Sequence, residues 1–170
     1  VIVPGSGGKD SAYASHVLKY KYGMNPLTVT WAPHKYTEIG WKNFENWIHE
    51  GGLDNILFTP NGKLHRYLTK EAFTNLLHPF QPFIVGQRII GPMMAAKFNV
   101  KLVFYGENQA EYGNNVDENY TPTMDKKFFS VDDPMDIMLG GKSIRDIISE
   151  TDFKLNDFIL LRFIYNMHLF

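Results

Sequence analysis

Short apolar runs separated by longer mixed segments form the main pattern along this chain. Four such runs cover residues 1–3, 27–31, 55–59 and 101–105, and each ends at a turn signal. Compact, mostly apolar runs of this length are typical of parallel strands that are buried on both faces. The pattern therefore predicts four β-strands.

The segments between these runs carry helical signals. Gly23 and the pair Gly51-Gly52 are stop signals, and Pro79 and Pro82 divide the longest connection into two parts. The predicted helices cover residues 10–22, 41–48, 65–77 and 83–98. Strands that alternate with helices predict an α/β fold with a doubly wound parallel sheet and right-handed crossovers.

The alternation stops at about residue 115. An irregular polar segment follows, and two short helices are predicted at Ser143–Ser149 and Leu155–Met167. We expect an α/β core over residues 1–115 and a partial C-terminal irregular and helical segment over 116–170. Because the chain begins inside the first predicted strand and without methionine, we also expect it to be a fragment.

The loops that follow the predicted strands are the candidate ligand-binding loops. In doubly wound sheets, ligands bind outside the carboxyl ends of the strands. The loops in question cover residues 4–11, 32–36, 60–62 and 106–113.

Composition narrows the range of functions. The formal net charge is −1, so the chain lacks the long-range attraction that nucleic-acid binders usually show. The 17 basic residues are scattered, with no basic run longer than Lys126-Lys127. No apolar run approaches the roughly 20 residues that cross a bilayer, so we expect a cytoplasmic protein that binds neither membrane nor nucleic acid. The absence of cysteine excludes a thiolate nucleophile and a cysteine-bound zinc within these residues.

The loop after the first strand reads Gly5-Ser-Gly-Gly-Lys-Asp-Ser11. Glycines between a strand and a helix free backbone N–H groups to bind an anion. The Walker phosphate loop would need glycine at Val3 and a hydroxyl residue at Asp10, and the dinucleotide fingerprint would need glycine or alanine at Asp10. Both familiar motifs therefore fail. The plain alternative is a glycine-rich turn that caps a helix through Asp10 or Ser11.

The hexapeptide SGGKDS resembles the signature of the PP-loop ATP pyrophosphatases, the superfamily of GMP synthetase, NAD synthetase and asparagine synthetase. This resemblance implies an adenine nucleotide alpha hydrolase-like fold, with ATP and Mg²⁺ as cofactors. The stretches NPLTVTWAPHKYTEIGW, TPNGKLHR, NLLHPFQPFIVGQ and YGENQAEYG further resemble the bacterial N-acetyl sugar amidotransferases. That family acts in lipopolysaccharide O-antigen and in pseudaminic and legionaminic acid biosynthesis, and the resemblance covers about residues 1–158.

The resemblance also implies roles for individual residues. Catalytic roles fall to Lys9, Asp10 and Glu107, and magnesium ligands are Asp10 and Glu107. The residues expected to bind the nucleotide are Ser6, Gly7, Gly8, Lys9, Asp10, Ser11, Thr30, Trp31, Ala32, Pro60 and Gly106. The residues expected on the substrate side are His34, His65, Arg66, Asn108 and Glu111.

Several of these residues also have an ordinary structural explanation. Trp31 is equally well interpreted as a core residue at a strand end, and Pro60 as part of a plain turn. For any single histidine, a surface position or a satisfied core position remains the favoured interpretation.

The implied reaction is ATP-dependent amidation. The acetamido oxygen of a nucleotide-linked N-acetyl sugar is adenylated, and ammonia then displaces AMP to leave an acetamidino group. Because the chain has no cysteine to hydrolyse glutamine, ammonia would come from a separate glutaminase subunit. The sequence leaves open whether the protein forms a homo-oligomer. The alternatives are a PP-loop enzyme that modifies transfer RNA and a non-catalytic ATP-binding module of the universal-stress-protein type.

Overall fold

The fold is an α/β sandwich around a small parallel sheet. The structure, a computed structural model, describes residues 1–107, 123 and 132–158. Within this described part, the sheet contains β1 (Ile2–Pro4), β2 (Leu27–Trp31) and β3 (Asp54–Phe58), in the order β1-β2-β3. All pairs are parallel, with Val3 opposite Thr28 and Val29 opposite Ile56. The expectation of an α/β fold with a parallel sheet is therefore confirmed.

The predicted fourth strand is reduced to a single parallel bridge between Ile2 and Val103. The Ile2 N–H donates to the Leu102 carbonyl at 2.9 Å, and the Phe104 N–H donates to the Ile2 carbonyl at 2.9 Å. Successive residues of a strand direct their backbone groups to opposite sides, and residues 1, 3 and 5 face β2. The segment around Val103 therefore lies on the free side of β1, but its pairing is too short to form a continuous strand.

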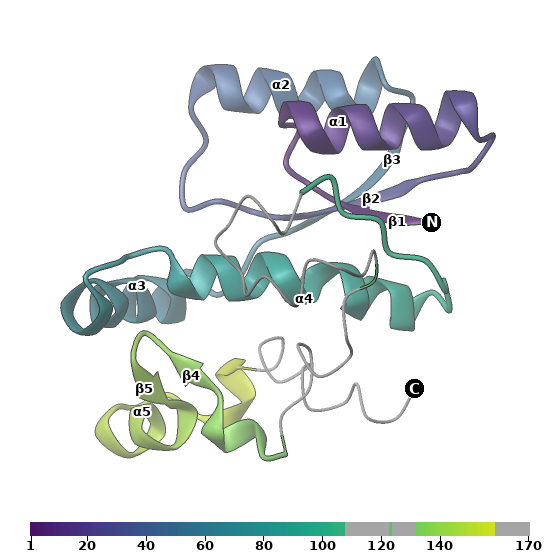
Figure 1. Cartoon of the computed structure of the whole chain (residues 1–170). Helices are drawn as coiled ribbons and strands as arrows, with labels where there is room; N and C mark the ends of the chain where they lie inside the picture. Colours follow the sequence, from purple (N-terminus) through teal and green to yellow (C-terminus); the bar gives the residue numbers. More distant parts are fainter. Residues whose placement is uncertain (108–122, 124–131, 159–170) are drawn as a thin grey trace.

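Helices cover both faces of the sheet, as Figure 1 shows. On one face lie α1 (Lys9–His16), which continues as a π-helical turn over Val17–Lys21, and α2 (Glu38–His49). On the other face lie α3 (Gly62–Leu76) and α4 (Gln81–Lys97). Each predicted helix of this region is present. The start of α4 differs from the prediction because Pro82 lies within its first turn, where a missing N–H costs no hydrogen bond.

The C-terminal part contains an element that the sequence pattern did not predict. Two short antiparallel strands, β4 (Met138–Leu139) and β5 (Lys142–Ser143), are joined by Gly140-Gly141, whose φ angles are 64° and 83°. Two residues with positive φ are typical of a tight hairpin turn. The hairpin follows a 3₁₀ turn at Pro134–Asp136 and leads into α5 (Ile144–Glu150).

The predicted helix at Ser143–Ser149 is confirmed as α5, with Ser143 as its N-cap in a reciprocal capping box with Asp146. The predicted helix over 155–167 begins as a 3₁₀ turn at Leu155–Phe158, and its remainder lies outside the described residues.

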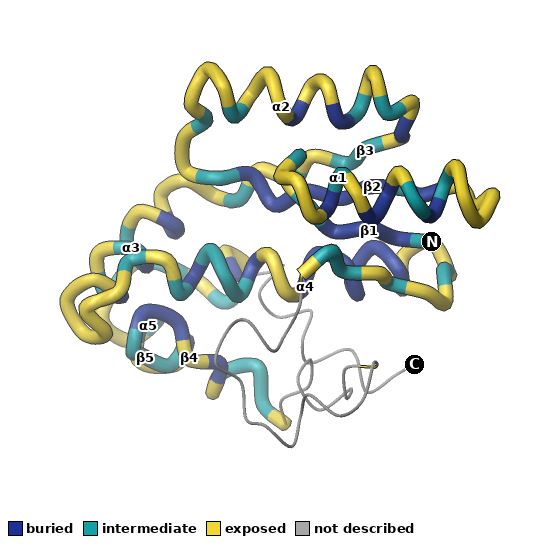
Figure 2. The backbone as a smooth tube through the Cα atoms, turned by 45° about the horizontal axis from the view of Figure 1, so that its top comes forward, coloured by how far each residue is buried: buried dark blue, intermediate teal, exposed yellow. Residues whose placement is uncertain are grey.

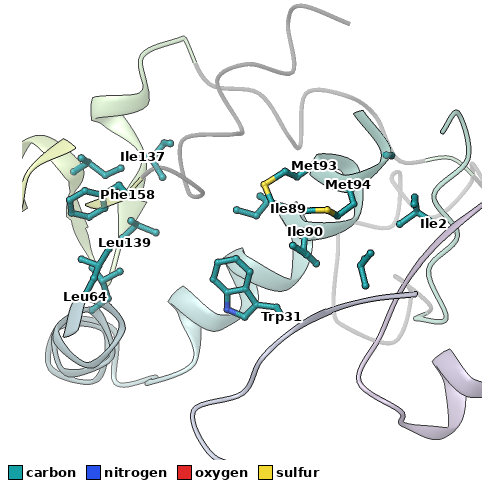
Figure 3. Packing of buried hydrophobic residues seen from close by; sticks show 14 of the residues in the cluster. Ile2, Trp31, Leu64, Ile89, Ile90, Met93, Met94, Ile137, Leu139 and Phe158 are labelled. Carbon is teal, nitrogen blue, oxygen red and sulfur yellow. The ribbon is translucent and has the colours of Figure 1, made fainter. Parts of the chain in front are cut away.

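The main hydrophobic core lies between the sheet and the helices α3 and α4, and it extends into the C-terminal part. Figure 3 shows Trp31 beside α4, and Ile137, Leu139 and Phe158 gathered next to Leu64 of α3. A smaller cluster of Phe44, Trp47 and Leu53 lies on the α1–α2 face. Figure 2 shows buried strands between helices whose outer faces are exposed. In the described part of the chain, none of the helices combines the length and apolarity needed to span a bilayer.

Candidate functional site

The glycine loop between β1 and α1 is held by close backbone contacts. The Gly5 N–H donates to the Val29 carbonyl at 3.0 Å, which ties the loop to β2. Gly7 has a φ of +82°, and a Cβ there would lie 2.8 Å from the Cα of Phe44. A side chain at Gly7 would therefore be strained in its own backbone and would also collide with α2. The loop therefore has no space for a side chain at Gly7.

Ser11 faces into the protein rather than toward solvent. Its side chain is 6% exposed, and its hydroxyl donates to the Gly8 carbonyl at 3.1 Å. The Ser11 carbonyl accepts from Ser15, whose hydroxyl in turn accepts from the indole N–H of Trp47, with both distances 2.8 Å. These contacts fix the loop against α1 and α2. Ser6, by contrast, is exposed.

The first turn of α1 has no capping side chain. Its N-cap is Gly8, whereas Thr37, Asn61 and Ser143 cap the first turns of α2, α3 and α5 with side-chain oxygens. The first N–H groups of a helix have no partner within the helix, and they bind anions well. Because no side chain competes for them at α1, this helix start is open to an external anion.

Lys9 and Asp10 stand in this first turn and project into solvent. The Lys9 side chain is 91% exposed and the Asp10 side chain 53% exposed, with 3.9 Å between Nζ and Oδ1. An exposed pair at this distance contributes little to folding. Both side chains are therefore available to a ligand at the mouth of the glycine loop.

The end of the 101–105 segment meets the same loop. A Cβ added to Gly106 would lie 2.7 Å from the Asp10 carbonyl carbon and 2.8 Å from the Ser11 nitrogen. Gly106 is thus in direct contact with the start of α1, and the exposed Glu107 follows it. β1 has β2 as its neighbour on one side and the Val103 segment on the other. The contact between Gly106 and the start of α1 therefore lies at a topological switch point of the sheet.

Two predicted substrate residues, Asn108 and Glu111, lie outside the described residues. Among residues 1–107, 123 and 132–158, no group of three metal-ligating side chains occurs. Magnesium is commonly held by one or two carboxylates together with phosphate oxygens. An exposed Asp10 beside an open helix start fits that limited donor set.

The residues at the end of β2 are buried. Thr30 is fully buried and its hydroxyl accepts from the Asn55 amide at 3.2 Å, while the Ala32 N–H donates to the Phe58 carbonyl at 2.8 Å. The Trp31 side chain is 3% exposed, and a Cβ at Gly86 would lie 2.1 Å from its indole Cε2. The indole therefore lies in the main core against α4, as the structural explanation of Trp31 requires.

The third predicted loop forms a helix start. The Asn61 side chain accepts from the Lys63 N–H at 3.0 Å and from the Leu64 N–H at 3.3 Å, which begins α3. Pro60 precedes this cap and is partly buried, and Arg66 is exposed one turn later.

Two of the predicted substrate histidines come together beside α3. The rings of His34 and His65 are 5.9 Å apart, and His34 lies 3.4 Å from the Thr69 hydroxyl. His65 is 3% exposed, and burial together with the neighbouring His34 lowers its pKa from 6.5 to about 4. His65 is therefore neutral near pH 7, which makes it unsuited to neutralise a phosphate.

The sequence-predicted residues thus form two groups. One contains the glycine loop with Gly106 and Glu107, and the other contains Trp31, His34 and His65 on the face of α3 and α4. The contacts of Phe44 with Gly7 and of Thr69 with His34 were missed, because a core-facing aromatic residue and an isolated helical threonine carry no sequence signal for a site.

A hollow of about 380 Å³ lies between α1 and α2, lined by Tyr13, Tyr20, Trp47 and Glu50 among others. Gly51 and Leu53, which precede β3, also line it, and none of the predicted site residues does. A scan against protein-family models and a search of curated proteins both find no match for this chain.

Proposed function

We propose that this protein is an ATP-dependent amidotransferase of the PP-loop type. It would adenylate the acetamido oxygen of a nucleotide-linked N-acetyl sugar and release pyrophosphate. The supporting observation is the setting of SGGKDS, which follows β1, opens an uncapped α1 and contacts Gly106 at the switch point of the sheet. A glycine-rich turn that only capped a helix would not require the 101–105 segment to end against it.

The loop residues take the following roles in this proposal. The backbone N–H groups of Gly7 and Gly8 and the hydroxyl of Ser6 bind the departing pyrophosphate, and Lys9 adds positive charge beside it. Ser11 holds the loop in shape through its bond to the Gly8 carbonyl. Asp10, with Glu107, would hold magnesium, which when bound neutralises phosphate charge.

The chemistry balances without a thiol. The acetamido oxygen forms a bond to the α-phosphorus of ATP, and the bond between the α-phosphorus and the bridging oxygen breaks, so pyrophosphate leaves. Ammonia then adds to the acetamido carbon, and AMP leaves with the former amide oxygen. Adenylation is needed because an amide oxygen is a poor leaving group. The ammonia would come from a partner glutaminase, since the chain has no cysteine.

The test is a turnover assay with ATP, magnesium, ammonium and a set of UDP- and CMP-linked acetamido sugars. We expect AMP and pyrophosphate, together with a sugar product in which NH has replaced oxygen, identified by mass spectrometry. Asp10→Asn should abolish AMP formation, and Asp54→Asn, an exposed carboxylate at the start of β3, should not change it. Release of ADP in place of AMP would contradict the proposal.

A further inference from the structure

Besides the Tyr36 hydroxyl, two buried polar atoms at the end of the sheet have no hydrogen-bond partner in the described part of the structure. They are the indole Nε1 of Trp31 and the imidazole Nδ1 of His65, on side chains that are each 3% exposed. Buried polar atoms are almost always hydrogen-bonded, since leaving one unpaired is costly. Two unpaired groups in neighbouring rings therefore need an explanation.

The end of β2 and the start of α3 bring the two rings next to each other. Trp31 is the last residue of β2 and His65 lies in the first turn of α3, with ring centroids 5.5 Å apart. Both belong to the carboxyl end of the sheet, where ligands bind in α/β folds. Gly86 fixes the indole from the α4 side, and the His65 backbone is bonded to Asn61 at 2.9 Å and to Thr69 at 2.7 Å. The positions of the two rings are therefore well determined.

His34 lies beside His65 at the protein surface. Its ring is exposed and stands 5.9 Å from the His65 ring and 6.1 Å from the Phe83 ring. Its ring nitrogen approaches the Thr69 hydroxyl at 3.4 Å, which is long for a hydrogen bond. His34 is therefore an exposed ring beside His65 that is held by ring contacts and by one long polar contact.

The chemistry of the two atoms selects an uncharged ligand group. The indole nitrogen can only donate, and a neutral imidazole offers one donor and one acceptor nitrogen. Neither group carries a charge to neutralise a phosphate or carboxylate in this buried place. A hydroxyl has one oxygen for both roles, whereas an amide presents its oxygen and its N–H at separate positions. An amide can therefore pair with both atoms at once, its oxygen with the indole N–H and its N–H with the imidazole nitrogen.

We propose that Trp31 and His65 form a subsite, beneath His34, that binds the acetamido group of the acceptor sugar. The indole N–H donates to the amide oxygen, and the imidazole Nδ1 accepts from the amide N–H. That this amide belongs to a sugar rests on the proposed function; the subsite itself rests on the two unpaired atoms. The competing occupant is a buried water molecule, which would satisfy the same two groups without any ligand.

The indole N–H resonance of Trp31 gives a direct test by NMR on ¹⁵N-labelled protein. Trp41→Phe and Trp47→Phe assign the three indole signals, and Trp47, bonded to Ser15, is the internal reference. N-acetylglucosamine should shift the Trp31 signal in a saturable manner, and glucose, which lacks the amide, should bind at least about tenfold more weakly. A Trp31 signal that ignores both sugars, or responds equally to both, would leave only a bound water and overturn the proposal.

His65→Leu should weaken N-acetylglucosamine binding by at least about tenfold. The substitution removes one hydrogen-bond partner and places an apolar side chain in the same buried position. His49→Leu, at an exposed position near the end of α2, is the matched control and should bind as the original protein does. An unchanged Trp47 indole signal shows that the variant is folded. Unchanged affinity in folded His65→Leu would refute the subsite.

The subsite and the proposed function fail in different ways. Asp10→Asn should lose AMP formation and keep the selective Trp31 shift, because Asp10 lies at the glycine loop. A selective Trp31 shift in a protein that forms no AMP with any acetamido sugar would retain the amide subsite and reject the adenylation reaction. AMP formation without a selective Trp31 shift would retain the reaction and reject the subsite.

Discussion

At the scale of single residues, close contacts decide which side chains this protein tolerates near its candidate site. At Gly7 and Gly106, backbone atoms lie within about 3 Å of the place that a Cβ would take, so neither position has space for a side chain. Ser11 is a hydroxyl that the sequence motif assigns to phosphate, and its contact in the fold is the Gly8 carbonyl. The same residue type can thus serve the loop and the ligand, and only the contacts distinguish these roles.

His65 should make folding stability depend on pH. Its pKa of about 4 in the folded protein lies below the 6.5 of the unfolded chain, because burial and the nearby His34 disfavour the charged ring. Between these values the unfolded chain binds the proton more strongly, so stability is full above pH 6.5 and falls as pH drops toward 4. The loss should be about 3 kcal/mol in total, once the pH is below both values.

Urea unfolding at pH 7 and pH 4.5 checks this expectation. His65→Leu should remove most of the loss on acidification and should match or exceed the original stability at pH 7, since it replaces an unpaired polar group with an apolar one. The other histidines remain in both proteins, so the difference between the two pH profiles isolates His65. Parallel pH profiles would show that His65 is not shielded as described.

At the scale of elements, α4 contains a proline whose missing hydrogen bond is replaced by a side chain from another segment. Pro92 lies inside this helix and has no N–H, so the Arg88 carbonyl one turn earlier loses its usual partner. The Tyr105 hydroxyl donates to that carbonyl at 2.9 Å, and burial raises the pKa of this tyrosine. Gly91, next to the proline, lets the 101–105 segment approach closely, with Tyr105 Oη 3.2 Å from the place that a Cβ would take. The hydrogen bond from Tyr105 therefore joins the segment to α4 at the carbonyl that Pro92 leaves free.

Tyr105→Phe should destabilise the protein by about 1–2 kcal/mol, because it leaves the Arg88 carbonyl without a partner. Thermal or urea unfolding measures this directly, and Tyr13→Phe, at a side chain that is 72% exposed, should have no measurable effect. Equal stability of the two variants would mean that water replaces the tyrosine at Arg88.

At the scale of the whole molecule, the C-terminal hairpin belongs to the same core as the sheet. Leu139 and Ile147 are fully buried in the cluster that includes Leu64 and Leu68 of α3. A Cβ at Gly140 would lie 2.9 Å from the Leu68 carbonyl, so the turn of the hairpin rests directly on the helix. Residues 132–158 therefore share the stability of the α/β part.

Leu139→Ala should destabilise the protein by about 2–5 kcal/mol, the usual effect of a cavity at a fully buried leucine. The loss should appear in one cooperative transition, seen at the same urea concentration by tryptophan fluorescence, which reports on the α/β part, and by far-ultraviolet circular dichroism. Met138→Ala, at a side chain that is 54% exposed, is the matched control. Two separate transitions would show that the hairpin folds independently of the sheet.

The sequence by itself determined the alternation of strands and helices, the position of the glycine loop and the place of α5. These features depend on local patterns, namely apolar runs, stop signals and capping residues, which act over a few residues. The loop residues of the candidate site were predicted for the same reason, since SGGKDS is contiguous in the chain.

The tertiary structure alone decided the features that join distant segments. It reduced the 101–105 run to one bridge with Ile2, and it buried Trp31 against Gly86. It also brought His65 to Trp31 and placed the Gly140-Gly141 turn on α3. Burial and hydrogen-bond partners arise from packing between elements, and packing has no counterpart in a local sequence pattern.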